Sequence, residues 1–232
     1  MGRPRWWRRL TAWLGDPEML RSWGLVANDG VISTAGILQG FAGAGAVDRT
    51  LVLAATTATV AGMLSVGGAE WAEAAAEREA QLTALAEEVR EQELDPHAQR
   101  AEVEAYYLGK GLSPELATRV ADELAALDPI SAQLESEHGI LAVTSRSETV
   151  ALGVGSGLAF GAGAAIPLLI TIVTPAAIEP TVILAAVLGS LVLTSVIGAR
   201  AGRMRVLRTV VRTLAVGVGT MAVSYLVGQV VF

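Results

Sequence analysis

The sequence predicts an all-α integral membrane protein with five transmembrane helices and a cytoplasmic helical insert between the second and the third. Three observations lead to this fold class. Of the 232 residues, 52% are hydrophobic and 17% are charged, whereas about 25% of the residues of a soluble domain are charged. Five apolar stretches are each long enough to cross a bilayer, which takes about 20 residues. Most acidic residues gather in one polar segment between the second and third stretches.

The five apolar stretches set the expected boundaries. They run over residues 25–46, 50–71, 149–173, 179–199 and 209–231. Glycine and alanine are frequent in most of them, which predicts close helix packing in a bundle or an oligomer. The expected domains are a cytoplasmic interfacial segment at 1–22, two transmembrane helices within 23–71, an acidic helical metal-binding insert at 72–148, and three transmembrane helices within 149–232.

Arginine residues set the expected orientation. Arg3, Arg5, Arg8 and Arg9 lie near the N-terminus before the first stretch, and four more arginines lie between the fourth and the fifth. The positive-inside rule therefore places the N-terminus and residues 72–148 in the cytoplasm and the C-terminus outside. The first residues, MGRPRWWRRLTAW, are basic and aromatic and lack a small-residue cleavage site, so we expect them to lie at the membrane interface. The expected location is a multi-pass protein of the cell inner membrane.

The first stretch carries an acid, Asp29, directly after Asn28. A carboxylate inside a bilayer is costly, and such residues mark ion pathways or pair with another group. The alternative is that Asp29 caps a helix that begins at Gly30. Glu70, the only acid of the second stretch, is the other candidate for a transport pathway. Glu73 follows it by one turn and is a candidate metal ligand.

The segment after the second stretch is acidic and helical. Residues 73–148 hold 17 acidic and 6 basic residues, a net charge of −11, which repels nucleic acid and attracts cations. Residues 70–94 continue the second stretch without a break signal. Asp95, Ser113 and Asp128 are each followed by proline, and this pattern predicts the starts of three short helices.

Some acids of this insert lie where solubility alone does not explain them. Glu137 continues the apolar stripe of Ile130 and Leu134, and Glu93 continues the stripe that begins at Leu82. Inward-facing carboxylates without any cysteine form an oxygen site suited to a hard or borderline divalent cation. A solvated acidic hairpin that binds nothing is the alternative.

The candidate metal ligands in the insert are therefore glutamates, with His97 and His138 near helix ends as lesser candidates. The glutamates are Glu73, Glu88, Glu91, Glu93, Glu102, Glu104, Glu135 and Glu137. No nucleophile, phosphate loop or nucleotide motif appears, so we expect neither an enzyme nor a permanently bound cofactor.

The chain resembles the vacuolar iron transporter (VIT) family from about residue 22 to residue 231. The motifs that carry the resemblance are ANDGVISTAGILQG, AGMLSVGGAEW, AYYLGKGL, EHGI, GSGLAFGAGAAIPLL, GARAGRMRVLRTVVRTLAVG and VSYLVG. The resemblance implies a homodimer that exports Fe²⁺, and often Mn²⁺, in exchange for protons along the dimer axis. It places Asp29 on the pathway, and it places metal capture on Glu102 and Glu137, with Glu88 and Glu91 upstream.

Two functions of different class follow. The first is a proton-coupled exporter of divalent metal, in which Asp29 from two protomers takes an ion or shares a proton. Ser33 and Gly36 lie on the same helix face as Asp29, and we expect this face to line the dimer axis. The alternative is a membrane-anchored metal sensor or storage module without transport, which has no need of an acid in its first span.

Overall fold

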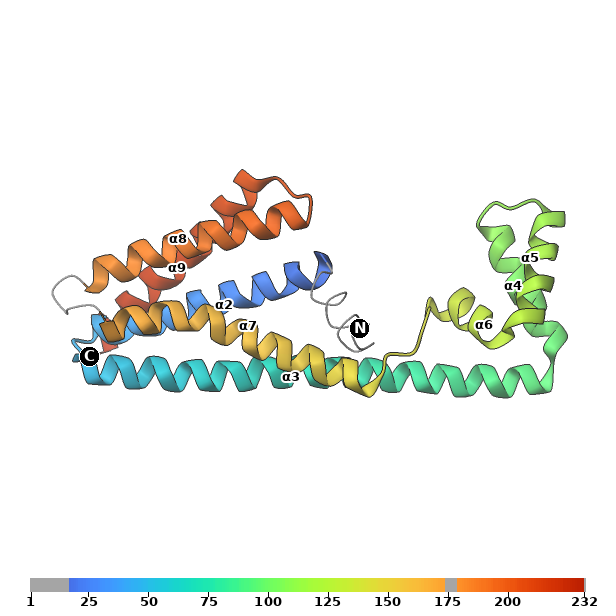
Figure 1. Ribbon diagram of the computed structural model, residues 1–232, viewed down its shortest axis with the longest axis horizontal. Helices are drawn as coiled ribbons and strands as arrows, with labels where there is room; N and C mark the ends of the chain where they lie inside the picture. The colour runs from blue at the N-terminus through green and yellow to red at the C-terminus, as the bar shows by residue number, and fades with distance from the viewer. Residues whose placement is uncertain (1–16, 174–178, 232) are drawn as a thin grey trace, which may run out of the picture. The chain divides into compact units, whose positions relative to one another are not determined.

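The computed structural model describes residues 17–173 and 179–231, and all regular structure in these ranges is helical (Figure 1). The expected interfacial segment at 1–22 lies mostly outside the described residues. The elements are α2 (Pro17–Gly43), α3 (Asp48–Leu94), α4 (Pro96–Gly109), α5 (Pro114–Leu127), α6 (Pro129–His138), α7 (Arg146–Val173), α8 (Glu179–Ala201) and α9 (Val206–Val231).

The chain divides into two compact units. The membrane unit comprises Met1–Glu70 and Gly153–Phe232, and the insert unit comprises Trp71–Leu152. The expected limits of the insert were 72–148, and α3 and α7 both begin in one unit and end in the other.

Four helices of the described residues are long and apolar enough to cross a membrane. They are α3, α7, α8 over Ile183–Arg200, and α9. Helix α2 is not among them, because Asn28, Asp29 and Gln39 lower its hydropathy. It nevertheless packs against α8 and α9. The sequence-based expectation of five spans is thus supported for four helices.

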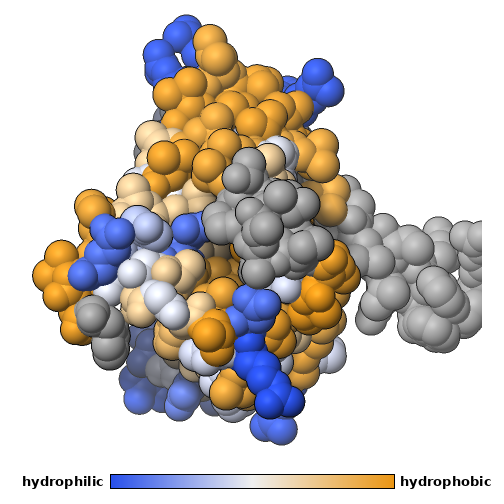
Figure 2. Space-filling model, turned by 90° about the vertical axis from the view of Figure 1, so that its left-hand side faces the viewer, coloured by the Kyte–Doolittle hydropathy of each residue, from blue (hydrophilic) through white to orange (hydrophobic). Residues whose placement is uncertain are grey.

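Large apolar side chains lie exposed on the membrane helices. Examples are Leu53 and Leu64 on α3, Leu158 on α7, Leu193 on α8 and Val230 on α9. Figure 2 shows hydrophobic residues over much of the face that it presents. Exposed apolar surface of this extent is expected where lipid or another protein covers the helices.

Helix α2 supplies much of the core of the membrane unit. Val31, Ala35 and Leu38 of α2 are buried together with Leu191 of α8 and Met221 of α9. Because α2 is enclosed in this way, each polar group on its inner side needs a partner within the protein.

Glycines bring α3 and α7 into close contact. A Cβ atom at Gly67 would lie 2.8 Å from the carbonyl oxygen of Gly153, and one at Gly157 would lie 2.8 Å from that of Met63. Real Cβ atoms do not approach a carbonyl this closely, so the two backbones touch only because these residues have no side chain. This is the packing that the small-residue content predicts.

The pair Gly67 and Gly68 offers a test of this contact. We expect Gly67→Ala to lower the unfolding temperature, because its methyl group would collide with the Gly153 carbonyl. The methyl group added by Gly68→Ala would have no neighbouring atom within 4 Å, and alanine is favoured over glycine in a helix by about 1 kcal/mol. Thermal unfolding of the detergent-purified protein measures both. Equal shifts for the two variants would show that α3 and α7 do not touch at this position.

The starts of the short helices agree with the sequence-based prediction. The Asp95 carboxylate accepts hydrogen bonds from the N–H groups of residues 97 and 98, at 3.1 and 3.0 Å. Ser113 caps α5, and Asp128 caps α6 through the Ser131 N–H at 3.1 Å. The Ser131 hydroxyl and N–H also hold the pKa of Asp128 below its ordinary value. Helices α4, α5 and α6 close around a small core of Val103, Ala121 and Ala132.

The apolar stripe expected on the α3 extension was assigned to the wrong face. Leu82, Val89 and Glu93 are exposed, whereas Ala84 and Glu88 are buried. Alanines around the whole helix make its hydropathy nearly uniform, so a few large side chains misled the prediction. The face that packs in the insert unit carries small and polar side chains instead.

Candidate metal centre and transport pathway

Three potential metal ligands converge in the insert unit from two helices. Glu88 lies on α3, and Glu137 and His138 are the last two residues of α6. One oxygen or nitrogen atom from each lies within 4.8 Å of the other two. Gly139 ends α6 in a left-handed conformation, with φ of 69°, which suits a residue without a side chain.

Glu88 is the buried member of this cluster, with 2% of its surface exposed. Its Oε1 atom lies 3.0 Å from Nε2 of His138, and its Oε2 atom has no hydrogen-bond partner. Burial raises the pKa of Glu88 above its ordinary value, the contact with His138 opposes this rise, and the charge of Glu137 adds to it. A buried carboxylate with one unpartnered oxygen is costly, so this position favours a ligand or a proton.

Glu137 differs from the sequence-based expectation. Leu134 is buried as predicted, but Glu137, one turn later, is exposed. The apolar stripe ends with Leu134, because α6 itself ends at His138 and Glu137 lies at its open end. The carboxylate of Glu137 still belongs to the cluster around Glu88.

A second cluster joins Glu91 and Glu102 through buried amides. The side-chain N–H₂ group of Gln99 donates to Glu91 Oε2 at 3.1 Å and to Glu102 Oε2 at 3.3 Å. The side-chain N–H₂ group of Gln133 donates to Glu102 Oε2 at 3.2 Å and to the backbone carbonyl of Gln99 at 2.8 Å. Gln99 Oε1 is buried without a partner. Sequence reasoning found the two acids but missed the glutamines that hold them together.

The other candidate glutamates lie elsewhere. Glu104 accepts a hydrogen bond from the Thr118 hydroxyl at 2.7 Å and forms an ion pair with Arg100 at 3.1 Å. Glu73, Glu93 and Glu135 are exposed, and Glu70 is half-buried.

In the membrane unit, Asp29 lies in the interior of a helix. Helix α2 runs from Pro17 to Gly43, so the alternative that Asp29 caps a helix beginning at Gly30 is wrong. The helix continues on the N-terminal side of the apolar stretch, and hydropathy alone did not show this. The carboxylate of Asp29 is exposed and accepts a hydrogen bond from the Ser33 hydroxyl at 3.2 Å.

The neighbours of Asp29 fix its direction. Asn28 is buried, and its side-chain oxygen accepts a hydrogen bond from the Thr194 hydroxyl of α8. A Cβ atom at Gly30 would collide with the Phe160 carbonyl oxygen of α7. The residues on both sides of Asp29 therefore face neighbouring helices, and Asp29 points away from this contact.

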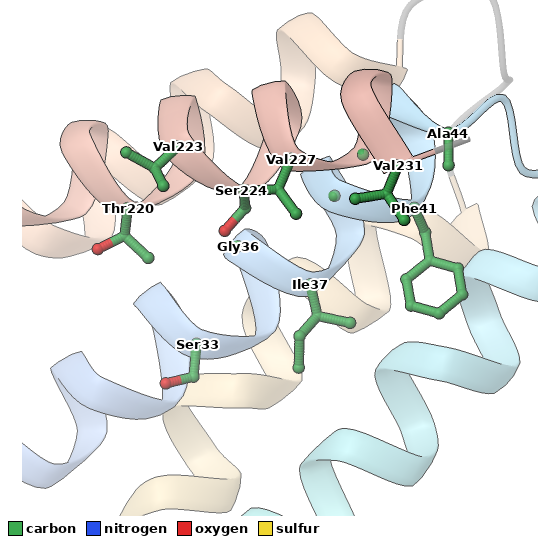
Figure 3. A pocket seen from close by; sticks show the side chains of 12 residues that line it. Ser33, Gly36, Ile37, Phe41, Ala44, Thr220, Val223, Ser224, Val227 and Val231 are labelled. Carbon is green, nitrogen blue, oxygen red and sulfur yellow. The ribbon is translucent and has the colours of Figure 1, made fainter.

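A cavity of about 610 Å³ lies between α2 and α9. The residues that line it are Ser33, Gly36, Ile37, Gly40, Phe41, Ala44, Thr220, Val223, Ser224, Val227, Gly228 and Val231. Figure 3 shows Ser33 and Thr220 toward one end of the cavity and Phe41 and Val231 toward the other.

One wall of this cavity bears on the expected dimer axis. A Cβ atom at Gly36 would lie 3.3 Å from both Ser224 Oγ and Thr220 Cγ2 of α9. Gly36 is buried against α9 of its own chain, so its position lends no support to the prediction that it lines a dimer axis together with Ser33, which stays a prediction. Ser33 is half-buried.

Comparison with known proteins gives two matches. A model of the VIT family matches residues 20–229, which include the insert unit and most of the membrane unit. The chain is 31% identical over 157 residues to a vacuolar iron transporter of Acanthamoeba castellanii. That alignment covers 68% of this chain and 57% of the relative, so the chain spans little more than half the length of the curated protein that it matches.

Proposed function

Because the chain belongs to the VIT family, we propose that it is a proton-coupled exporter that moves Fe²⁺, and also Mn²⁺, out of the cytoplasm. The observation that carries this proposal is the position of Asp29, an exposed carboxylate in the interior of a helix that packs against two membrane spans. The similarity of the chain to a protein named as a vacuolar iron transporter supports iron as the cargo.

In this proposal the insert unit lies in the cytoplasm and captures the metal. Its net charge of −11 raises the local concentration of cations. The cluster of Glu88 and Glu137 and the cluster of Glu91 and Glu102 supply carboxylate oxygens.

The proposed pathway runs along α2, which then forms the fifth span. A charged residue within a membrane is expensive and marks an ion path. Asp29 points away from the contacts that Asn28 and Gly30 make within the chain, so a second copy is the proposed partner. Two carboxylates held close together cannot both ionise cheaply. In the proposed pair, metal binding displaces the proton that the two carboxylates share, which couples the two flows.

The test of this function is transport by the purified protein in liposomes that contain a pH-sensitive dye. We expect Fe²⁺ or Mn²⁺ to cross the membrane and protons to move in the opposite direction. Metal binding without any crossing would instead support the alternative, a membrane-anchored sensor or storage module.

The proposed dimer predicts a crosslink at Asp29. The chain has no cysteine, so Asp29→Cys introduces a single thiol that should react with its twin when the protein is treated with a short bismaleimide in membranes. Ala35→Cys is the matched control, because Ala35 lies on the same helix and is fully buried. Dimer bands on denaturing gels report the result. Absence of a crosslink from Asp29→Cys, at reagent concentrations that label the thiol, would remove Asp29 from the dimer axis.

A further inference from the structure

We propose that His138 is a metal ligand, and that Glu88, Glu137 and His138 form a mixed oxygen and nitrogen site that selects borderline transition metals over Mn²⁺, Mg²⁺ and Ca²⁺. This inference rests on the proposed function, since the site would act on the same metal that the insert captures. It adds a nitrogen donor to what the sequence indicates is an all-oxygen site.

The spacing of the three donor atoms suits one ion. Ligands of a borderline metal lie about 2.0–2.2 Å from it, so any two of them are at most ~4.4 Å apart. The donors of this cluster lie within 4.8 Å of one another, and Nε2 of His138 is already 3.0 Å from Glu88 Oε1. Glu137 is exposed at the end of α6. A small rotation of this free side chain closes the remaining distance.

An unpartnered oxygen indicates that the cluster is more than an ion pair. The contact with His138 satisfies only Oε1 of Glu88, and Oε2 is buried without a partner. An ion pair alone therefore leaves the cost of this buried oxygen uncompensated. An ion pair also gives no role to Glu137, whose carboxylate belongs to the same cluster of donor atoms. A divalent cation between the three groups satisfies the free oxygen and neutralises both carboxylates.

The place of the cluster also favours a cation. Glu137 and His138 are the last two residues of α6, where the helix dipole presents partial negative charge. The side chain of His138 is 31% exposed, so water can reach the site and complete the coordination of an ion. The buried side of the site is fixed by Glu88 and the open side is solvated, which suits an ion that must enter and leave.

The nitrogen donor determines the selectivity. Carboxylates and water suit Mg²⁺, Ca²⁺ and Mn²⁺, whereas imidazole suits Fe, Zn and other metals of the later first row. Replacing one oxygen donor by imidazole therefore strengthens binding of Fe²⁺, Co²⁺ and Zn²⁺ more than binding of Mn²⁺. Selection of this kind at the point of capture would bias the cargo toward iron in a chain without sulfur ligands.

The two histidines of the chain provide a matched pair of variants. His138→Gln keeps a hydrogen-bond donor for Glu88 but removes the imidazole, and His97→Gln changes an exposed histidine at the start of α4. Binding of Co²⁺, as an air-stable substitute for Fe²⁺, and of Mn²⁺ is measured by calorimetry on the full chain in detergent. We expect His138→Gln to weaken Co²⁺ binding by at least about tenfold while the affinity for Mn²⁺ changes little. His97→Gln should alter neither.

X-ray absorption of bound Co²⁺ gives a readout that a purely structural role of His138 would not change. The wild-type protein should show outer-shell scattering from one imidazole, and His138→Gln should lose it while His97→Gln retains it. A wild-type spectrum without imidazole scattering, or equal loss of Co²⁺ and Mn²⁺ binding in His138→Gln, overturns the inference and leaves capture by carboxylates intact. A wild-type protein that binds neither metal instead overturns the proposed capture itself.

Discussion

Glu88→Gln should abolish tight capture of divalent metal by the insert. Glu88 is the buried member of its cluster, and its Oε2 atom is shielded from water and has no hydrogen-bond partner among the described residues, so it is available to bind a metal ion. Glutamine has the same shape and can still bond to His138, but it lacks the charge that a divalent ion requires. We expect metal affinity to fall by at least about tenfold, because even an indirect partner of a metal ligand contributes that much.

Glu104→Gln is the control for this experiment. Glu104 belongs to the same insert, but its carboxylate is held by Thr118 and Arg100. Removing its charge alters the net charge of the insert as much as Glu88→Gln does, while both clusters stay intact. Calorimetry with Co²⁺ on the full chain compares the two variants. Equal losses would show that the insert attracts metal only through its overall charge.

Local features of this fold could be read from the sequence. The caps at Asp95, Ser113 and Asp128 depend on hydrogen bonds within three residues and on a proline that follows directly, so the short segment contains all the information. The apolar stretches behind α3, α7, α8 and α9 are likewise a property of about twenty consecutive residues.

Features that depend on distant residues could not be read in this way. Glu88 and His138 are 50 residues apart and meet only because α6 returns to α3. The glutamine Gln99 gave no signal, since an amide between two carboxylates looks like any polar residue of a helix. The buried face of the α3 extension was missed because its alanines give no contrast in hydropathy.

Asp29 combines a feature that the sequence shows with features that only the fold shows. The sequence identified the residue, because an acid in an apolar stretch is unusual. It could not show that α2 begins well before the acid, nor that Asn28 bonds to Thr194 of α8, 166 residues away. These contacts show that Asp29 points outward from the interior of a helix. The sequence alone does not separate this arrangement from an acid that caps the end of a helix.

Asp29→Asn should stop transport while the protein remains folded and binds metal. Asparagine preserves the shape of the side chain and its contact with Ser33, but it can neither release a proton nor balance a divalent charge. Asp48→Asn is the matched control, because Asp48 is an exposed acid in the first turn of α3 and undergoes the same chemical change. The insert is untouched in both variants, so its metal affinity should be that of the wild type.

The most direct test of transport through Asp29 is therefore metal-driven proton movement in liposomes, compared for the wild type, Asp29→Asn and Asp48→Asn, with metal binding measured in parallel. We expect coupled movement of metal and protons for the wild type and Asp48→Asn, and none for Asp29→Asn despite normal binding. Transport at the wild-type rate by Asp29→Asn would contradict the claim that ions and protons cross at this carboxylate.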